Sequence, residues 1–415
     1  MSVSIPSGWR EVELRDLLAE SDERVGPRSD LPLLSVTKYD GAVLAKDRFS
    51  RVLASKDLSR YRVAPRDAVV IDPMLLWDGV IALQHRFAEG VVSPDYRVFR
   101  FTSDTDPAFF DYLAHAGAMR RQYARAARGT NVRRRRISRD DFLAIRVVVP
   151  PLGEQRQIAA TLMAVDEAIA AGKAVVQHLR EVRQVLVEAL VAPSGNSIVL
   201  RGETRSPPSA WHEVRLGDVL TGIDAGWSPA CEPDAAGANE WGVLKVSCAS
   251  WGEFLPGENK RLPRKLEPRP ELQVRPGDLL MSRANTKDLV GRAVLVRETP
   301  PRLLLSDKLL RLSVKPDAAA PAFINLVLAS KRVRELIEDS ATGSSKSMKN
   351  ISQDAVRALP VTLPPVAVQE EIASAVEVVD ARIRVEEGVV EQRRTAQRAL
   401  QGELLSGRLR VRDAA

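Results

Sequence analysis

One internal repeat constrains this chain more than any other feature of its sequence. Residues 137–169 and 351–383 match at 13 of 33 positions, at a constant offset of 214 residues and without a gap. Both copies contain a short apolar segment, a Pro-Pro pair and a long stretch with helical spacing. The repeat is too long for a solenoid unit, so we predict a duplicated two-part module.

Each half of the chain also begins in the same way as the other. The stretch PSGWREVELRDLL begins at Pro6 and PSAWHEVRLGDVL begins at Pro208, whereas the interiors that follow differ widely. We therefore predict an α+β fold with a pseudo-two-fold internal repeat, in which two mixed α/β domains are joined by two long helices. The predicted boundaries are 1–150 for the first domain, 151–192 for its helix, 193–207 for a linker, 208–364 for the second domain and 365–408 for its helix.

Within the two domains, apolar runs broken by Gly, Pro and Asp indicate short strands. These runs occupy residues 67–76, 79–87, 278–283 and 291–298. Late in each domain, the spacing of apolar residues predicts one continuous helix, over residues 106–127 and 321–339.

The two long helices carry a narrow apolar stripe that alternates in steps of four and three, as in a coiled coil. Such a stripe is unstable on a lone helix, so we predict that the two helices pair antiparallel. The alternative is that each helix packs separately on its own domain as core. The predicted interface residues are Ile158, Leu162, Val165, Ile169, Val176, Leu179, Leu186, Leu190, Ile372, Val376, Val379, Ile383, Val390, Leu400 and Leu404.

The chain is basic, with a net charge of +7 and a pI near 9.5. This balance favours a polyanionic partner such as nucleic acid, although a soluble protein can also simply be basic. No run of eighteen apolar residues exists, and the first residues lack the pattern of a signal peptide. We therefore expect a cytoplasmic protein without a membrane span.

Positive charge is concentrated between Arg120 and Arg139, where nine arginines occur without an acidic residue. The planar guanidinium suits phosphate groups and guanine edges, so we predict DNA contact here. A solvated charge run, or a patch that binds RNA without specificity, is the alternative. The candidate DNA-binding residues of the first half are Lys38, Arg120, Arg121, Arg125, Arg128, Thr130, Asn131, Arg133, Arg134, Arg135 and Arg136.

The equivalent place in the second half holds the segment ATGSSKSMKNIS, residues 341–352. Its small residues would let backbone N–H groups approach a phosphate closely, and its hydroxyl and amino groups add donors. The candidate DNA-binding residues of this half are Lys245, Ser247, Arg283, Ser344, Ser345, Lys346 and Lys349.

Catalytic motifs are missing from the sequence. There is no G-x-G-x-x-G, no Walker loop, no H-E-x-x-H and no cysteine or histidine spacing typical of zinc, so we predict no catalytic residue and no bound metal. One alternative is a stand-alone Mg²⁺-dependent endonuclease, in which Asp234, Glu258 and Lys260 would form a PD…E-x-K-like site.

The repeated junction resembles that of the specificity subunits of type I restriction–modification enzymes. The first copy reads VVVPPLGEQRQIAATLMAVD, and the degenerate second copy reads VTLPPVAVQEEIASAVEVVD, with Val368 in place of the usual Glu. The openings of both halves, VAPRDAVVI and GSSKSMKNIS are also similar to this family. The resemblance spans both halves of the chain.

This resemblance implies a non-catalytic subunit for phage defence, with two target recognition domains and an antiparallel coiled coil. Each domain would read one half of a bipartite, asymmetric duplex DNA target. The partners would be two methyltransferase subunits and up to two restriction subunits, which would hold S-adenosylmethionine, ATP and Mg²⁺, in a bacterial or archaeal nucleoid. A scaffold whose DNA-reading domains have decayed is a further alternative.

Overall fold

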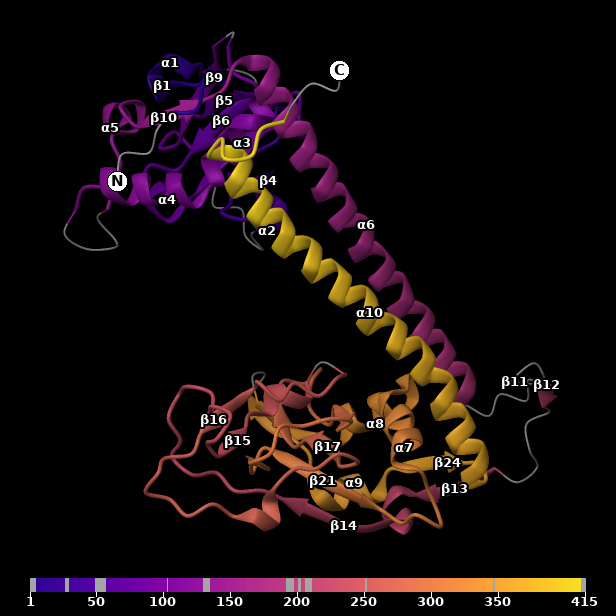
Figure 1. The fold of residues 1–415 in the computed structure, drawn as a ribbon. Coiled ribbons are helices and arrows are strands. Elements are labelled where there is room, and N and C mark those ends of the chain that lie inside the picture. The colour runs from indigo at the N-terminus through magenta and orange to yellow at the C-terminus, as the bar shows by residue number, and fades with distance from the viewer. Residues whose placement is uncertain are drawn as a thin grey trace. The chain divides into compact units, whose positions relative to one another are not determined.

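The computed structural model describes residues 5–26, 30–48, 57–102, 104–129, 135–191, 198–200, 203–205, 211–250, 252–345 and 348–411. Its contacts divide the chain into two compact units (Figure 1). Unit 1 comprises Met1–Lys173 and Gly388–Ala415, and unit 2 comprises Ala174–Glu387. The two long helices, α6 (Leu152–Val191) and α10 (Val366–Leu405), each contribute one part to either unit.

Unit 1 is a mixed α/β domain built on antiparallel strands. Its elements before α6 are β1 (Arg10–Glu13), α1 (Leu14–Leu17), β2 (Leu18–Ser21), β3 (Leu34–Val36), β4 (Ala42–Leu44), α2 (Ala45–Arg48), β5 (Arg62–Pro65), β6 (Ala68–Ile71), η1 (Leu76–Asp78), β7 (Ile81–Gln84), β8 (Glu89–Val92), β9 (Arg97–Phe101), α3 (Pro107–His115), α4 (Gly117–Ala126), α5 (Arg139–Leu143) and β10 (Arg146–Val149).

Unit 2 repeats this plan with more irregular loops. Its elements between α6 and α10 are β11 (Ile198–Leu200), β12 (Glu203–Arg205), β13 (His212–Arg215), η3 (Leu216–Val219), β14 (Leu220–Ala225), β15 (Gly242–Leu244), η4 (Val246–Ala249), β16 (Asn259–Arg261), η5 (Pro270–Leu272), β17 (Leu279–Ser282), β18 (Ala284–Asn285), β19 (Ala293–Leu295), β20 (Leu303–Leu304), β21 (Leu309–Val314), α7 (Pro321–Ala329), α8 (Lys331–Ser340), β22 (Thr342–Ser345), β23 (Met348–Asn350), α9 (Gln353–Ala358) and β24 (Pro360–Leu363).

The central sheets of the two units have the same strand order. In unit 1 the order is β2-β9-β6-β7, and in unit 2 it is β14-β21-β17-β19, with every neighbouring pair antiparallel. Each domain is then closed by its first and last strands, because β1 pairs with β10 and β13 pairs with β24. The chain leaves each closing strand through Pro-Pro and enters a long helix, as the repeat predicts.

The two long helices run antiparallel within each unit. In unit 1, Gly172 of α6 faces Val390 of α10, and Arg393 donates to the backbone carbonyl of Ala168 at 3.0 Å. In unit 2, Arg180 pairs with Glu387 at 2.6 Å, and Arg183 pairs with Asp380. Numbers that rise along α6 therefore fall along α10, which is the pairing that the apolar stripe predicts.

The apolar stripe serves both predicted roles. One part of it pairs the two helices, and another part packs each helix on a domain core. Ile169, Val176, Ile383 and Val390 are buried without belonging to a domain core, so they form a seam between helices. The other buried interface residues lie in the domain cores: Ile158, Leu162 and Leu404 in unit 1, and Leu190, Ile372 and Val376 in unit 2. Half-buried positions are Val165, Leu179, Leu186, Val379 and Leu400.

The prediction of one continuous helix late in each domain is wrong. The chain forms α3 and α4 in unit 1, and α7 and α8 in unit 2, with breaks at Ala116 and Ser330. Both break residues have extended backbones, with φ/ψ of −63°/147° and −65°/149°. The apolar spacing continues across a one-residue break, so a periodicity pattern does not reveal it. The two breaks are 214 residues apart, as the repeat requires.

Two smaller expectations also differ. The run 67–76 is a strand only as far as Ile71, because the residues after it form a turn and η1. The predicted linker 193–207 contains the short hairpin β11-β12. Along the parts of the chain that the structure covers, no helix combines the length and the apolar character needed to cross a membrane.

Candidate nucleic-acid interface

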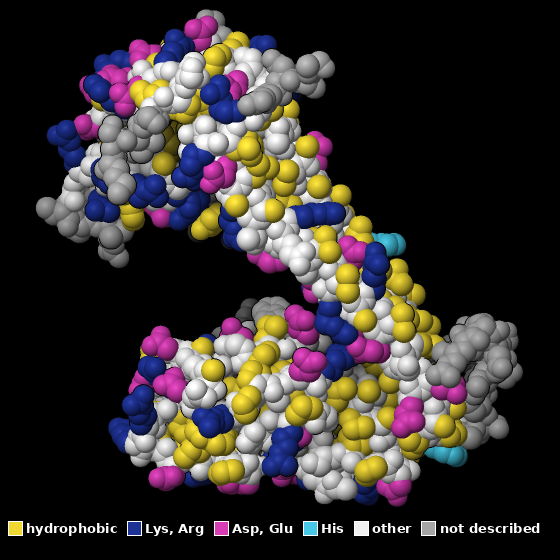
Figure 2. Space-filling view, viewed as in Figure 1, with side chains coloured by type: hydrophobic (Ala, Val, Ile, Leu, Met, Phe, Trp, Pro, Cys, Tyr) yellow, Lys and Arg dark blue, Asp and Glu magenta, His cyan; other side chains and the backbone are white. Residues whose placement is uncertain are grey.

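Helix α4 presents an arginine-rich face on unit 1. Met119 and Tyr123 are buried one turn apart and anchor the helix, and the Tyr123 hydroxyl donates to the Ala114 carbonyl at 3.2 Å. Arg120, Arg121 and Arg125 lie on the exposed side of the helix, away from these anchors. Figure 2 shows Lys and Arg side chains gathered where α4 lies in Figure 1.

The charges of this face are available to a ligand. Among the described residues, Arg120, Arg121 and Arg125 have no acidic side chain within ion-pair distance, whereas Arg128 pairs with Asp141 at 2.7 Å. Of the other candidates in the run, Arg135 is half-buried and Arg136 is exposed. Thr130, Asn131, Arg133 and Arg134 lie outside the described residues. The described arginines give this face the positive charge and the exposure that phosphate binding requires.

Next to α4 lies a tight turn, residues 72–79, between β6 and β7. The Trp77 indole N–H donates to the Met74 carbonyl at 2.8 Å, which holds the turn together. The Arg135 guanidinium lies 5.3 Å from the centre of the Trp77 ring. Lys38, another candidate, pairs with Asp78 at 2.7 Å and is thereby held at the turn. The structure thus brings Lys38, Arg120 and Arg135 to one place.

The candidates of unit 2 are less concentrated. Lys245 forms a salt bridge with Glu258 at 3.8 Å, and the Ser247 hydroxyl donates to the same carboxylate at 2.6 Å. Both side chains are therefore already paired with an acidic residue. Lys349 on β23 donates to the Gly343 carbonyl at 2.5 Å, and Arg283 is exposed beside the loop after β17. Ser344 and Ser345 lie on β22, but their side chains and all of Lys346 are outside the described part of the chain.

The helix equivalent to α4 does not repeat its arginine face. At the offset of 214, Arg120, Arg121 and Arg125 correspond to Arg334, Glu335 and Asp339 of α8. Arg334 is only 6% exposed, and burial lowers its pKa to about 10. The two units thus share a framework and differ in surface chemistry.

The two carboxylates of the endonuclease alternative have different side-chain neighbours. The Glu258 carboxylate accepts from the Ser247 hydroxyl, and the Asp234 carboxylate lies 3.9 Å from Arg261. Within the described ranges, no three His, Cys, Asp or Glu side chains group closely enough to hold a metal ion.

A repeated glutamine joins each domain to its long helix, a role that the sequence alone did not indicate. In unit 1, the Gln155 amide donates to the carbonyls of Asp104 and Pro150 at 3.1 and 2.9 Å, and its oxygen accepts from the Asp106 N–H at 2.9 Å. In unit 2, Gln369 makes the same contacts with Ala318, Pro364 and Ala320. Both side chains are buried, so they fix each domain on its helix.

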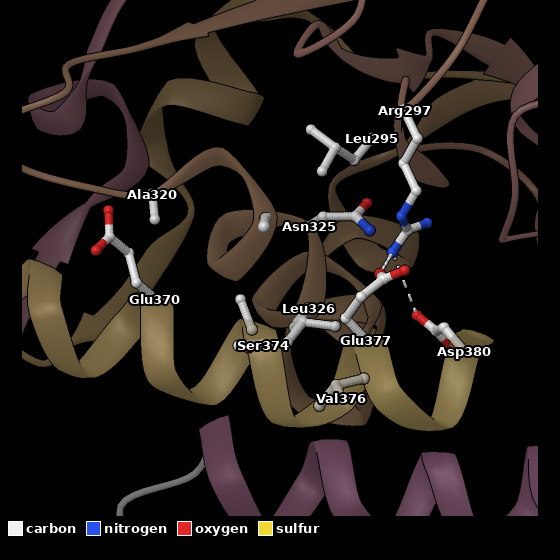
Figure 3. Close-up of a pocket in the computed structure, with 12 residues that line it drawn as sticks. Leu295, Arg297, Ala320, Asn325, Leu326, Glu370, Ser374, Val376, Glu377 and Asp380 are labelled. Carbon is white, nitrogen blue, oxygen red and sulfur yellow. Dashed lines mark hydrogen bonds and ion pairs between the residues drawn. The ribbon is translucent and has the colours of Figure 1, made fainter. Parts of the chain in front are cut away.

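A repeated aspartate makes a second joint with different partners. Asp166 of α6 accepts from the Tyr112 hydroxyl of α3 at 2.6 Å. Its counterpart Asp380 on α10 lies 3.6 Å from Arg297 and is also paired with Arg183 of α6. Figure 3 shows Arg297 reaching from the domain toward Glu377 and Asp380, at one side of a cavity of about 350 Å³. In the sequence, this contact is indicated only by the presence of aspartate at both equivalent positions of the repeat, Asp166 and Asp380.

The degenerate position of the second copy has a visible consequence. In unit 1, Glu154 accepts from the Trp9 indole at 3.0 Å and pairs with Arg410 at 2.6 Å. In unit 2, Val368 replaces that glutamate and packs against the core. The Trp211 indole N–H, which corresponds to that of Trp9, is buried without a hydrogen-bond partner among the described residues. The first copy of the joint is therefore the more fully bonded one.

Comparison with known proteins gives curated relatives that are type I restriction enzyme specificity subunits. No family model matches the chain. Over 171 residues, 41% of its length, the chain is 38% identical to the type I restriction enzyme EcoEI specificity subunit of Escherichia coli, of which the match covers 29%. Three further type I specificity subunits, at 22 to 26% identity, align with 64 to 66% of this chain. The matched stretch spans less than two thirds of each of these relatives, between 29 and 64% of their length.

Two solved structures share the fold. One comes from work on complex assembly and conformational transition of the type I R-M system, with a TM-score of 0.59 at 19% identity, covering 98% of this chain and 100% of that one. The other is the type I restriction–modification S subunit from M. genitalium, with a TM-score of 0.52 at 12% identity, covering 97% and 98%. These likenesses concern the fold alone, and they confirm the predicted arrangement of two domains with two long paired helices.

Proposed function

We infer the function of this chain from its kinship with the specificity subunits of type I restriction enzymes, whose sequence signature and fold it shares. The chain is a non-catalytic subunit that recognises a bipartite, asymmetric sequence in duplex DNA. It directs a methyltransferase, and a restriction subunit where one is present, to that sequence.

One observation carries this proposal: the two units share a framework and differ in surface. Sheet order, closing strands and the glutamine joint are the same in both. The equivalent helices α4 and α8 nevertheless differ, since Arg121 and Arg125 correspond to Glu335 and Asp339. A protein that reads two unlike half-sites needs this combination, because a duplicated frame can meet the local two-fold symmetry of a DNA backbone while different surfaces read different bases.

The partner subunits dock on the long helices in this proposal. Both helices carry large apolar side chains on their outer faces within unit 2, including Val185 and Val378, each 70% exposed. Val175, Val182 and Val385 are exposed as well. These exposed valines offer apolar area that a bound partner would bury. S-adenosylmethionine, ATP and Mg²⁺ are held by those partners and not by this chain.

A methylome comparison tests the proposal. Single-molecule sequencing of host DNA, with and without the gene for this chain, should show one bipartite adenine-methylated motif that disappears on deletion. Half-site centres about 10 base pairs apart, one turn of duplex, are expected from the geometry of paired DNA-binding domains. An unchanged methylome, with the partner methyltransferase expressed, would contradict the proposal. Cleavage of duplex DNA by the lone chain with Mg²⁺ would instead favour the endonuclease.

A further inference from the structure

The two units hold equivalent turns on equivalent supports. Turn 72–79 lies between β6 and β7, and turn 283–291, which includes β18, lies between β17 and β19. Each turn ends at a glycine with a left-handed backbone, Gly79 with φ of 93° and Gly291 with φ of 67°. A side chain would be strained in that conformation, so both turns are tightly specified.

The residues that contact the two turns from elsewhere in the chain are equivalent at the offset of 214. The Ile137 N–H donates to the Pro73 carbonyl at the start of the first turn, and the Ile351 N–H donates to the Arg283 carbonyl at the start of the second, both at 3.0 Å. A guanidinium nitrogen lies 3.5 Å from the Cβ position of each turn glycine, that of Arg120 on α4 at Gly79 and that of Arg334 on α8 at Gly291. The two turns are therefore held by equivalent residues, although the first contains η1 and the second contains β18.

The side chains at the tips of the turns are different in kind. The first tip exposes two adjacent apolar side chains, Met74 at 42% and Leu75 at 45%. The second exposes Thr286, Lys287 and Asp288. The two adjacent apolar residues give the first tip a surface that a ligand can cover with a gain in free energy.

Basic side chains lie beside both tips. Arg135 stacks on Trp77 beside the first tip, and Lys38 is held there by Asp78. At the second turn, β18 pairs with β23 and brings Lys349 opposite Asn285. A basic rim around a protruding tip fits duplex DNA, because the rim meets phosphates while the tip enters a groove.

We propose that turns 72–79 and 283–291 are the base-reading elements of the two domains. The apolar tip of the first turn contacts thymine methyl groups or wedges against a base step, and the polar tip of the second donates hydrogen bonds to base edges. This inference rests on the proposed function. It names the residues by which the two half-sites come to differ.

Selection from a DNA library tests the proposal with matched variants. The full chain, in complex with its methyltransferase partner, selects from duplexes randomised over both half-sites, and the bound fraction is sequenced. The variants are Met74→Ala/Leu75→Ala and Thr286→Ala/Lys287→Ala. Their controls are Leu409→Ala and Lys265→Ala, which replace an exposed apolar residue and an exposed lysine outside the long helices. Thermal unfolding of each variant, unchanged from wild type, establishes that it folds.

The expected result is a loss confined to one half-site for each variant. Base preference should fall about 5- to 150-fold at one or more positions of one half-site for the Met74/Leu75 variant, and of the other half-site for the Thr286/Lys287 variant. The control variants should retain the base preference at both half-sites. Retention of both half-sites by both variants, or an equal weakening of both half-sites by each, would overturn the proposal. If the wild-type complex selects no bipartite sequence, the proposed function itself fails.

Discussion

At the scale of single residues, the two glutamines explain why the junction is repeated so faithfully. Gln155 and Gln369 are 1% and 0% exposed, and each satisfies three backbone groups. These groups lie just before a domain helix and at the Pro-Pro pair, where no regular backbone pairing is available. A side chain that both donates and accepts is required, so glutamine is retained where the surrounding residues vary.

Replacing this glutamine should destabilise the chain. We expect Gln155→Ala to cost about 2–4 kcal/mol, because it leaves buried backbone groups without partners. For a unit of this size, that cost lowers the unfolding midpoint by roughly 5–15 °C in thermal unfolding of the full chain. The control is Gln177→Ala, an exposed position on the same helix, which should change the midpoint by about 1–2 °C at most. Equal midpoints for the two variants would mean that Gln155 is not a joint.

At the scale of elements, the long helices approach each other closely at one glycine. A Cβ atom added at Gly172 would lie 2.8 Å from a methyl group of Val390. Valine is stiff at its first side-chain torsion and cannot easily turn away. Gly172 therefore sets the distance between α6 and α10 in unit 1. It lies at a heptad position where the apolar stripe of the sequence is interrupted.

Alanine at Gly172 should lower the free energy of unfolding, whereas alanine at Gly388, where the added methyl group meets no neighbour, should raise it. Gly172→Ala gains about 1 kcal/mol in helix propensity, but overpacking against Val390 costs about 1–3 kcal/mol, so we expect net destabilisation. Gly388→Ala on α10 has no atom within 4 Å of the added Cβ and should stabilise by about 0.5–1 kcal/mol. Both are measured by chemical denaturation. Adding Val390→Ala to Gly172→Ala should show favourable coupling, and additive energies would contradict the proposed clash.

At the scale of the whole molecule, the proposed function treats the long helices as a spacer between two reading domains. The helices are continuous and both contain 40 residues. Their apolar seam repeats every seven residues, so removing one heptad from each keeps the seam in register. The residue pairs across the seam identify matching heptads, 170–176 in α6 and 386–392 in α10, since Gly172 faces Val390.

Deleting these two heptads should change spacer length and leave the half-sites unchanged. Seven helical residues correspond to about 10 Å, or about three base pairs of duplex. The methylome of a host carrying the shortened chain should therefore show the same half-sites around a shorter spacer. A matched variant that lacks four residues from each helix breaks the register of the seam and should lose the motif. New half-sites in the shortened chain would show that the helices do not act as a spacer.

The sequence by itself determined the large plan of this protein. The duplication, the two domains, the long paired helices and the resemblance to type I specificity subunits follow from the repeat around Pro150-Pro151 and from heptad spacing. These are local patterns, and each is legible within a window of a few tens of residues. The arginine run is likewise visible in the sequence, and its first part lies on α4.

Only the tertiary structure decided what individual side chains do. Arg334 is basic in sequence but buried in unit 2, and Lys245 and Ser247 are both held by Glu258. The breaks at Ala116 and Ser330 lie within unbroken helical spacing, and turns 72–79 and 283–291 correspond only through their supports. Burial, pairing and exposure depend on residues that are distant along the chain and adjacent in space, and a local pattern contains no record of those neighbours.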